Sequence, residues 1–238
     1  MDKQIGMTVD KATRLANKFL AEYNGNIGVQ LIVVARQEDK YGPANTAERF
    51  GIIKGAYHPE RRAFVLVASN LGDEEDARRT IRHELLGHYG LNTFKPAEKR
   101  ALLDSVLETR QEPSLKNIWA RVDRNYADRP ELYKAEEVFA FVAEQERSPI
   151  GRAWDRVLNT LQKVLRRTGL SHAPLTQAEL RDEARIIAQG IRNGTRQQQI
   201  FPKTDMDQFR IESDPASDKP QPSQQSFRPR RPAVDLER

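Results

Sequence analysis

Two of the four histidines of this chain lie close together, in the segment His83-Glu84-Leu85-Leu86-Gly87-His88, and a glutamate follows the first of them. Imidazole nitrogens are good zinc ligands, and a nearby carboxylate can take a proton from a metal-bound water. The common helical zinc motif spaces its histidines four residues apart, whereas His83 and His88 are five apart. These residue types predict a metal centre with two histidine ligands and with Glu84 as the general base.

The five-residue spacing sets a condition on the backbone that carries the two histidines. On a regular α-helix, residues five apart point roughly 140° away from each other around the axis, so their imidazoles cannot share one ion. A single wide, π-type turn absorbs one residue and brings both side chains to the same side. Gly87 lies within this turn, where its missing Cβ tolerates an irregular backbone. We therefore predict a π-type turn between Glu84 and His88.

A catalytic zinc needs a third protein ligand and one position for water. Because the chain has no cysteine, that ligand is a His, Asp or Glu. His58 lies in a predicted turn and His172 in a predicted loop, and both are weaker candidates than a carboxylate. Glu136 and Glu137 lie in an apolar helical segment, where neighbours point about 100° apart, so one of them faces the interior and needs a partner. We expect Glu137 as the third ligand and Glu136 as a hydrogen-bond partner of a ligand imidazole.

The elements that position these residues follow from hydrophobic periodicity and turn residues. We expect an α+β fold of the zincin-like type, in which a small sheet of three or more strands packs on the metal-bearing helix and a helical region follows. The metal-bearing helix should begin at Glu74 and end near Gly90. The expected strands are Val29–Ala35, Phe50–Tyr57 and Ala63–Ala68, the last two forming a hairpin of which either could be an open edge. The other expected helices are Met7–Tyr23, Pro96–Glu108, Pro113–Ala127, Pro130–Gln145, Ile150–Thr168 and Thr176–Asn193, and Gln37–Glu48 is expected to be a loop.

The composition limits the classes of protein to which the chain can belong. It has 238 residues, of which 38% are hydrophobic and 31% charged. We expect one globular domain, residues 1–194, and a disordered tail rich in Gln and Pro, residues 195–238. The longest aliphatic run, Leu31–Ala35, is too short to cross a bilayer and no signal peptide is visible, so we expect a cytoplasmic protein without membrane contact. The net charge of +5 is spread along the chain and supports a nucleic-acid partner only weakly.

Two motifs of the chain resemble those of known zinc enzymes. The segment His83–His88 resembles the H-E-L-L-G-H motif of the dipeptidyl peptidase III family, and Glu136–Ala140 resembles that family's E-E-x-x-A motif. The resemblance implies two histidine ligands, a glutamate ligand at Glu137 and a catalytic base at Glu84. Over roughly residues 28–145 the chain also resembles the zincin-like metallopeptidase domains of phage and plasmid polyvalent proteins. This second resemblance implies a protein of a bacterial mobile element.

The sequence thus predicts a zinc metallopeptidase of the gluzincin type, which binds one Zn²⁺ ion and hydrolyses a peptide or protein substrate. Its oxyanion donor is left open, with Tyr89, Tyr126, Tyr133 and His172 as candidates. One alternative is a catalytically silent zinc-binding or anti-defence interaction module. Another is a basic accessory protein that binds nucleic acid.

Overall fold

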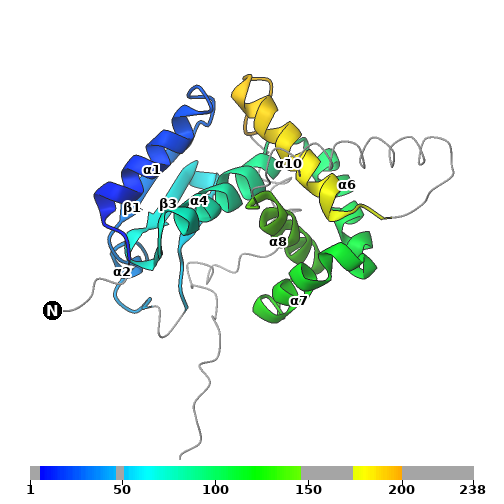
Figure 1. Cartoon of the computed structure of the whole chain (residues 1–238), viewed down its shortest axis with the longest axis horizontal. Coiled ribbons are helices and arrows are strands. Elements are labelled where there is room, and N and C mark those ends of the chain that lie inside the picture. The colour runs from blue at the N-terminus through cyan, green and yellow to red at the C-terminus, as the bar shows by residue number, and fades with distance from the viewer. Residues whose placement is uncertain (1–5, 47–50, 146–173, 200–238) are drawn as a thin grey trace, which may run out of the picture.

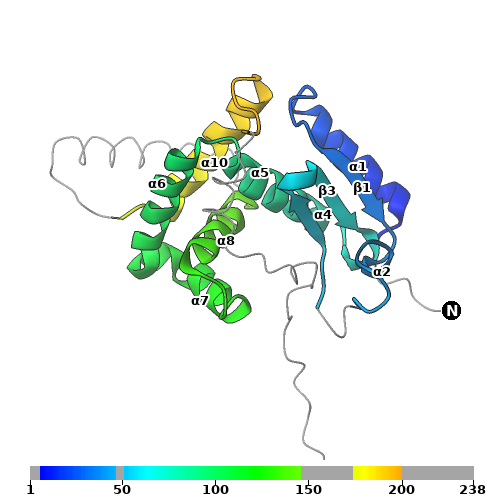
Figure 2. The same cartoon turned by 180° about the vertical axis from the view of Figure 1, so that it is seen from behind.

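A computed structural model describes residues 6–46, 51–145 and 174–199 of the chain (Figures 1 and 2). One part contains a small sheet, another contains helices alone, and the segment that carries His83 and His88 runs between them. The sheet part comprises α1 (Val9–Ala21), β1 (Gln30–Val34), α2 (Gln37–Tyr41), β2 (Gly55–His58), η1 (Pro59–Arg61), β3 (Ala63–Val67) and η2 (Ala68–Asn70). The motif segment comprises α4 (Glu74–Arg82), η3 (His83–His88) and α5 (Tyr89–Leu91). The helical part comprises α6 (Pro96–Leu107), η4 (Glu108–Gln111), η5 (Pro113–Leu115), α7 (Lys116–Asn125), α8 (Glu131–Ala143) and α10 (Gln177–Arg192).

The sheet has three strands in the order β1-β3-β2. Strand β3 runs parallel to β1 and antiparallel to β2, with Val65 opposite Ile32 and Phe64 opposite Tyr57. Every residue of β3 is buried, as expected for an apolar central strand. The predicted hairpin between β2 and β3 is confirmed, and β2 is the edge strand of the two.

Helix α1 covers the sheet beside β1 and also packs against α4 (Figure 1). Its Ala12 and Ala16 are fully buried, four residues apart on one face, which is the pattern of an amphipathic helix. Thr8 caps its start by accepting a hydrogen bond from the Lys11 backbone N–H. Asn24 and Gly25 follow this helix with left-handed backbone angles, φ 54° and 72°, which do not continue a right-handed helix.

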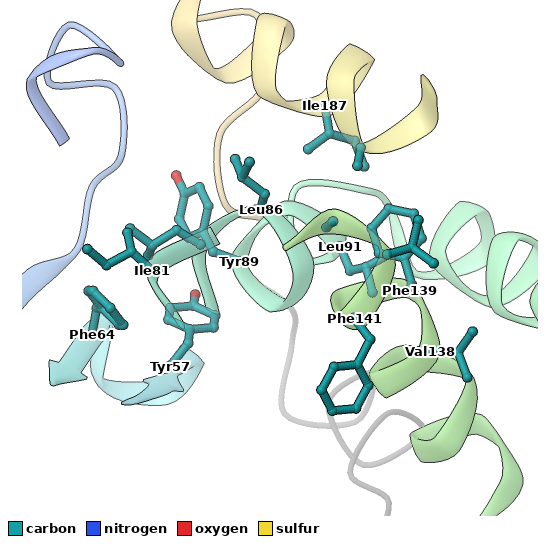
Figure 3. Packing of buried hydrophobic residues seen from close by; sticks show 14 of the residues in the cluster. Tyr57, Phe64, Ile81, Leu86, Tyr89, Leu91, Val138, Phe139, Phe141 and Ile187 are labelled. Carbon is teal, nitrogen blue, oxygen red and sulfur yellow. The ribbon is translucent and has the colours of Figure 1, made fainter. Parts of the chain in front are cut away.

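Helix α8 is the centre of the helical part and packs against α6, α7 and α10 as well as against η3. It is buried almost throughout from Ala135 to Ala143. In Figure 3, the motif segment lies between two groups of core side chains. Tyr57, Phe64, Ile81 and Tyr89 gather on the sheet side, and Val138, Phe139 and Phe141 belong to α8.

The observed class is α+β, mostly helical, with a small sheet. The segment Gln37–Glu48, predicted as a loop, instead begins with the short helix α2, because Gln37 turns inward and hydrogen bonds to the backbone at Gly51 and Ile53. The strand predicted from Phe50 begins only at Gly55. The predicted helix Ile150–Thr168 lies outside the described residues. Within the described residues, no helix is long and apolar enough to span a bilayer.

The contacts of the globular part continue past the predicted domain boundary at residue 194. The Arg196 guanidinium lies 4.2 Å from the centre of the Phe94 ring. The Gln198 side chain donates a hydrogen bond to the Pro59 carbonyl (3.1 Å), and the Gln199 N–H donates one to the carbonyl of Asn92 (3.0 Å). Residues 195–199, assigned to the tail from sequence, therefore pack on the domain; the rest of the predicted tail lies outside the described residues.

Candidate metal centre

The motif segment begins as a regular helix and widens where the histidines lie. Asp73 caps α4 by accepting a hydrogen bond from the Asp76 N–H (2.7 Å). The segment His83–His88 then forms a π-helix, in which the Tyr89 N–H donates to the Glu84 carbonyl five residues earlier. The predicted wide turn is therefore confirmed. It brings the two imidazole rings to the same side, with ring centres 5.1 Å apart.

Gly87 is required at this turn by packing. A Cβ on Gly87 would lie 2.6 Å from the Ala140 Cβ and 2.7 Å from the Ala140 Cα. The two backbones of η3 and α8 therefore approach closely only because this position has no side chain. This approach brings the carboxylates of α8 within reach of the imidazoles. From the sequence, Gly87 was expected only to tolerate an irregular backbone at the wide turn.

Glu137 lies between the two imidazoles. Its Oε2 is 3.5 Å from His83 Nε2 and its Oε1 is 3.7 Å from His88 Nε2. Two ligand atoms each about 2.1 Å from a tetrahedral zinc ion would be about 3.4 Å apart. Each imidazole nitrogen has one Glu137 oxygen near that separation, a different oxygen for each ring. Glu137 is 3% exposed, and its Oε2 has no hydrogen-bond partner within the described residues. A buried carboxylate oxygen without a donor fits a site that accepts a cation.

Glu136 points to the opposite nitrogen of one imidazole. Its Oε1 is 2.9 Å from His88 Nδ1, and its Oε2 is 2.9 Å from the buried Lys99 Nζ. Burial raises the pKa of Glu136, but Lys99 and His88 outweigh that effect and lower it to about 2. An ionised carboxylate at Nδ1 fixes the imidazole with Nε2 facing Glu137, which is the supporting position that the sequence predicted for Glu136.

Glu144 provides the matching contact for the other imidazole and was missed in the sequence analysis. Its Oε2 lies 3.3 Å from His83 Nδ1. A usable signal was present, because Glu144 follows Glu137 by seven residues, two helical turns, and so shares its face of α8.

Glu84 of the motif segment belongs to the same cluster and also contacts the sheet. One oxygen of Glu84 lies within 4.8 Å of ligand nitrogens of both His83 and His88. Its Oε2 accepts a hydrogen bond from the Tyr57 backbone N–H (2.9 Å), which ties the edge strand β2 to the motif segment. This contact uses a backbone donor of β2, so β2 does not present the fully open edge expected for strand addition.

The electrostatics of the cluster favour positive charge between the carboxylates. Burial lowers the pKa of His83, but Glu137 and Glu144 outweigh it and raise that pKa to about 10. Burial likewise lowers the pKa of His88, and contacts with Glu136 and Glu137 raise it above its ordinary value. The surrounding carboxylates therefore favour positive charge at both imidazoles, and a divalent cation bound there would displace any protons that they hold.

Two of the four candidate oxyanion donors, Tyr126 and Tyr133, lie at this cluster. Burial raises the pKa of Tyr126 and of Tyr133, and the negative charge of the nearby Glu137 carboxylate raises both further, so both hydroxyls stay protonated. Tyr89 points elsewhere: its ring packs edge-on against Tyr57, and its hydroxyl lies 3.5 Å from the Asn26 carbonyl (Figure 3). The reason is that the residue after His88 is rotated by about 100° around the helix, towards the sheet. His172 lies outside the described residues.

The chain is similar to a much longer protein, DNA primase TraC from Escherichia coli. The two are 34% identical over 207 residues, which cover 83% of this chain and 14% of TraC. The chain therefore spans only a small part of the length of this relative. No protein-family model and no solved structure matches the chain.

These findings correct the identity and the activity predicted from sequence. Membership of the zincin-like metallopeptidase domains or of the dipeptidyl peptidase III family is contradicted, because no family model matches and the relative is described as a DNA primase. The predictions of a zinc metallopeptidase and of a peptide or protein substrate were wrong for the same reason; the relative is named as an enzyme of another kind. Short motifs specify how side chains are arranged, and the same arrangement can serve unrelated functions.

Proposed function

We propose that this chain is an accessory module of a DNA-processing protein related to TraC, and that it contacts nucleic acid. The observation that carries this proposal is the 34% identity to DNA primase TraC across 83% of the chain. The net charge of +5 supports it, because an excess of Lys and Arg attracts the phosphate backbone independently of sequence. We expect such a module to act in the cytoplasm, and its origin in a mobile element stays part of the proposal.

We further propose that the module holds one zinc ion through His83, His88 and Glu137. The close approach of the three side chains, the unpaired Glu137 oxygen and the two carboxylates behind the imidazoles support this ligand set. When bound, zinc supplies Lewis acidity and lowers the pKa of a bound water. Glu84 would accept a hydrogen bond from that water, while Tyr126 and Tyr133 would remain neutral donors beside Glu137.

The metal centre lies at the junction of the two parts of the fold. The histidines belong to the motif segment, and Glu137 belongs to α8 in the helical part. An ion bound by all three would cross-link these elements and stabilise the folded state by mass action. The zincin-like arrangement of a metal-bearing helix beside a small sheet is part of this proposal as a fold, with no peptidase activity attached to it.

A direct binding experiment tests the nucleic-acid proposal. The zinc-loaded full chain is titrated into a fluorescently labelled single-stranded oligonucleotide, and anisotropy is recorded at several salt concentrations. We expect saturable binding with a Kd of about 10⁻⁴–10⁻⁶ M near physiological salt, and a log affinity that falls linearly with log salt. Polyglutamate of matched charge is the control competitor and should displace the oligonucleotide poorly. The absence of saturable binding at about 50 mM salt would contradict the proposal.

A further inference from the structure

A small cavity lies on the sheet part and shares no residue with the metal centre. It has a volume of about 130 Å³ and is lined by Lys40, Tyr41, His58 and Arg61, which we call the basic pocket. Lys40 and Tyr41 end α2, whereas His58 and Arg61 belong to the connection from β2 to β3. A water molecule occupies about 30 Å³ of liquid, so the cavity has room for a group of a few heavy atoms.

The charge of the basic pocket is only partly neutralised by the protein. The Lys40 side chain makes no ion pair or hydrogen bond with any part of the chain that the structure describes. Arg61 meets one carboxylate, that of Glu60, with Nε and Oε1 3.9 Å apart. Exposed pairs at such a distance contribute little, and two cations against one anion leave a net charge of +1.

The two neutral groups of the pocket share one hydrogen bond and together leave one donor for a bound group. The Tyr41 hydroxyl lies 3.4 Å from His58 Nε2, and the two ring centres are 6.3 Å apart. Burial lowers the pKa of His58; the Glu60 carboxylate opposes this, and Lys40 and Arg61 add to the lowering. His58 is therefore a neutral imidazole near pH 7, with one N–H donor.

We propose that the basic pocket binds a phosphate group, and that in the protein at work this phosphate belongs to a nucleic-acid backbone. Lys40 would supply a mobile charge, Arg61 a planar set of donors, and Tyr41 and His58 hydrogen-bonding groups at the cavity wall. The proposal that a phosphate group binds here rests only on the residues of the basic pocket. The assignment of that phosphate to nucleic acid rests on the proposed function.

Matched variants separate the basic pocket from the general positive charge of the chain. The double variant Lys40→Gln/Arg61→Gln removes two charges from the pocket. The control Arg14→Gln/Lys18→Gln removes two charges from the exposed face of α1, where neither residue forms an ion pair within the described residues. We expect the pocket variant to lose about tenfold or more in oligonucleotide affinity and to flatten the salt slope by about 1 to 2, with a much smaller change in the control. Melting temperatures equal to that of wild type first show that both variants are folded. Equal losses of oligonucleotide affinity in the two variants would then contradict phosphate binding by the basic pocket.

A second measurement keeps this inference separate from the proposed function. Inorganic phosphate, a nucleoside triphosphate and the oligonucleotide are each added to the full chain while the His58 side-chain nitrogen resonances are followed by NMR. A saturable shift with the oligonucleotide and with phosphate supports the inference as stated. A shift with phosphate or the triphosphate but none with the oligonucleotide shows a free-anion site, so the nucleic-acid assignment fails while the pocket stands. No shift with any of the three overturns the pocket itself.

Discussion

Each imidazole of the candidate metal centre meets one carboxylate at Nε2 and another at Nδ1. Glu137 lies at the Nε2 side of both rings, while Glu136 and Glu144 lie at the Nδ1 atoms of His88 and His83. A carboxylate behind a ligand imidazole fixes the ring orientation and increases its basicity, so its loss weakens metal binding without removing a ligand.

Glu144 provides the test of this arrangement that sequence analysis did not suggest. We expect Glu144→Ala to lower zinc affinity about 10- to 100-fold, measured by competition with a chromophoric chelator. Glu144→Gln should recover part of that loss, because its amide oxygen keeps a polar acceptor atom beside Nδ1. The exposed Glu108→Ala is the control and should bind zinc as wild type does. An unchanged affinity for Glu144→Ala would show that its contact with His83 has no role in metal binding.

Gly87 tests the close packing that brings α8 to the imidazoles. The methyl group of Gly87→Ala would overlap Ala140, so η3 and α8 must separate. We expect a loss of about 1–3 kcal/mol in the free energy of unfolding and weaker zinc binding. Gly28→Ala is a matched control, since a Cβ there meets no atom within 4 Å. Chemical denaturation measures the free energy of unfolding of both variants. A wild-type value for Gly87→Ala would show that the approach of η3 to α8 does not require a glycine at this position.

Among the elements, the start of α4 depends on one carboxylate with several partners. Both Asp76 oxygens lie 2.8 Å from Lys54 Nζ, and Oδ2 also accepts from the Gly72 N–H (3.0 Å). Burial raises the pKa of Asp76, but the hydrogen bonds from Lys54 and Gly72 outweigh it and lower the pKa below its ordinary value. Since the folded pKa is lowered, the stabilisation is fully present above the unfolded value and is lost as pH falls through the folded one.

The sign of this shift gives a pH-dependent prediction for Asp76→Asn. At pH 7 the variant should be less stable than wild type by about 1 kcal/mol, because the charged acceptor is gone. The difference should begin to shrink as the pH falls below about 4, where the unfolded carboxyl becomes protonated, and should be lost as the pH falls through the lower folded pKa. Paired urea denaturations at pH 7 and at about pH 2.5 measure it. A difference that is the same at both values would exclude the carboxylate as the cause.

Residues 195–199 test how far the packed structure extends beyond α10. A chain ending at Gly194 loses the contacts of Arg196, Gln198 and Gln199, whereas a chain ending at Gln199 keeps them. We expect the shorter chain to unfold at a lower temperature than the longer one, by an amount corresponding to about 1–3 kcal/mol for these few contacts. Identical thermal unfolding of the two chains would support the boundary predicted from sequence.

Over the whole molecule, the sequence predicted those features that repeat or that have one chemical solution. The helices α1, α6 and α10 bury one face each and were found from their periodicity. The wide turn followed from the spacing of His83 and His88, which has no other way to bring both rings together. Helix α2 was missed because its residues are polar, and Gln37 is buried to form hydrogen bonds with distant backbone that a sequence pattern does not show.

The function of the whole molecule was the least predictable part. The spacing of the candidate metal-binding residues does not by itself indicate a function, and the proposed contact with nucleic acid is supported by the similarity to DNA primase TraC. Likewise, the basic pocket unites α2 with the turn after β2, residues about 20 positions apart whose proximity depends on the fold. Contacts of this kind leave no local periodic signal.

The zinc content of the purified chain tests the central claim, that His83, His88 and Glu137 form one metal centre. Wild type, Glu137→Ala and the control Glu108→Ala are incubated with zinc, dialysed exhaustively and measured by elemental analysis, after circular dichroism has shown that all three are folded. We expect about one zinc ion per chain in wild type and in Glu108→Ala, and far less in Glu137→Ala. A wild-type chain that retains no zinc, or a Glu137→Ala chain that retains a full equivalent, would contradict the account.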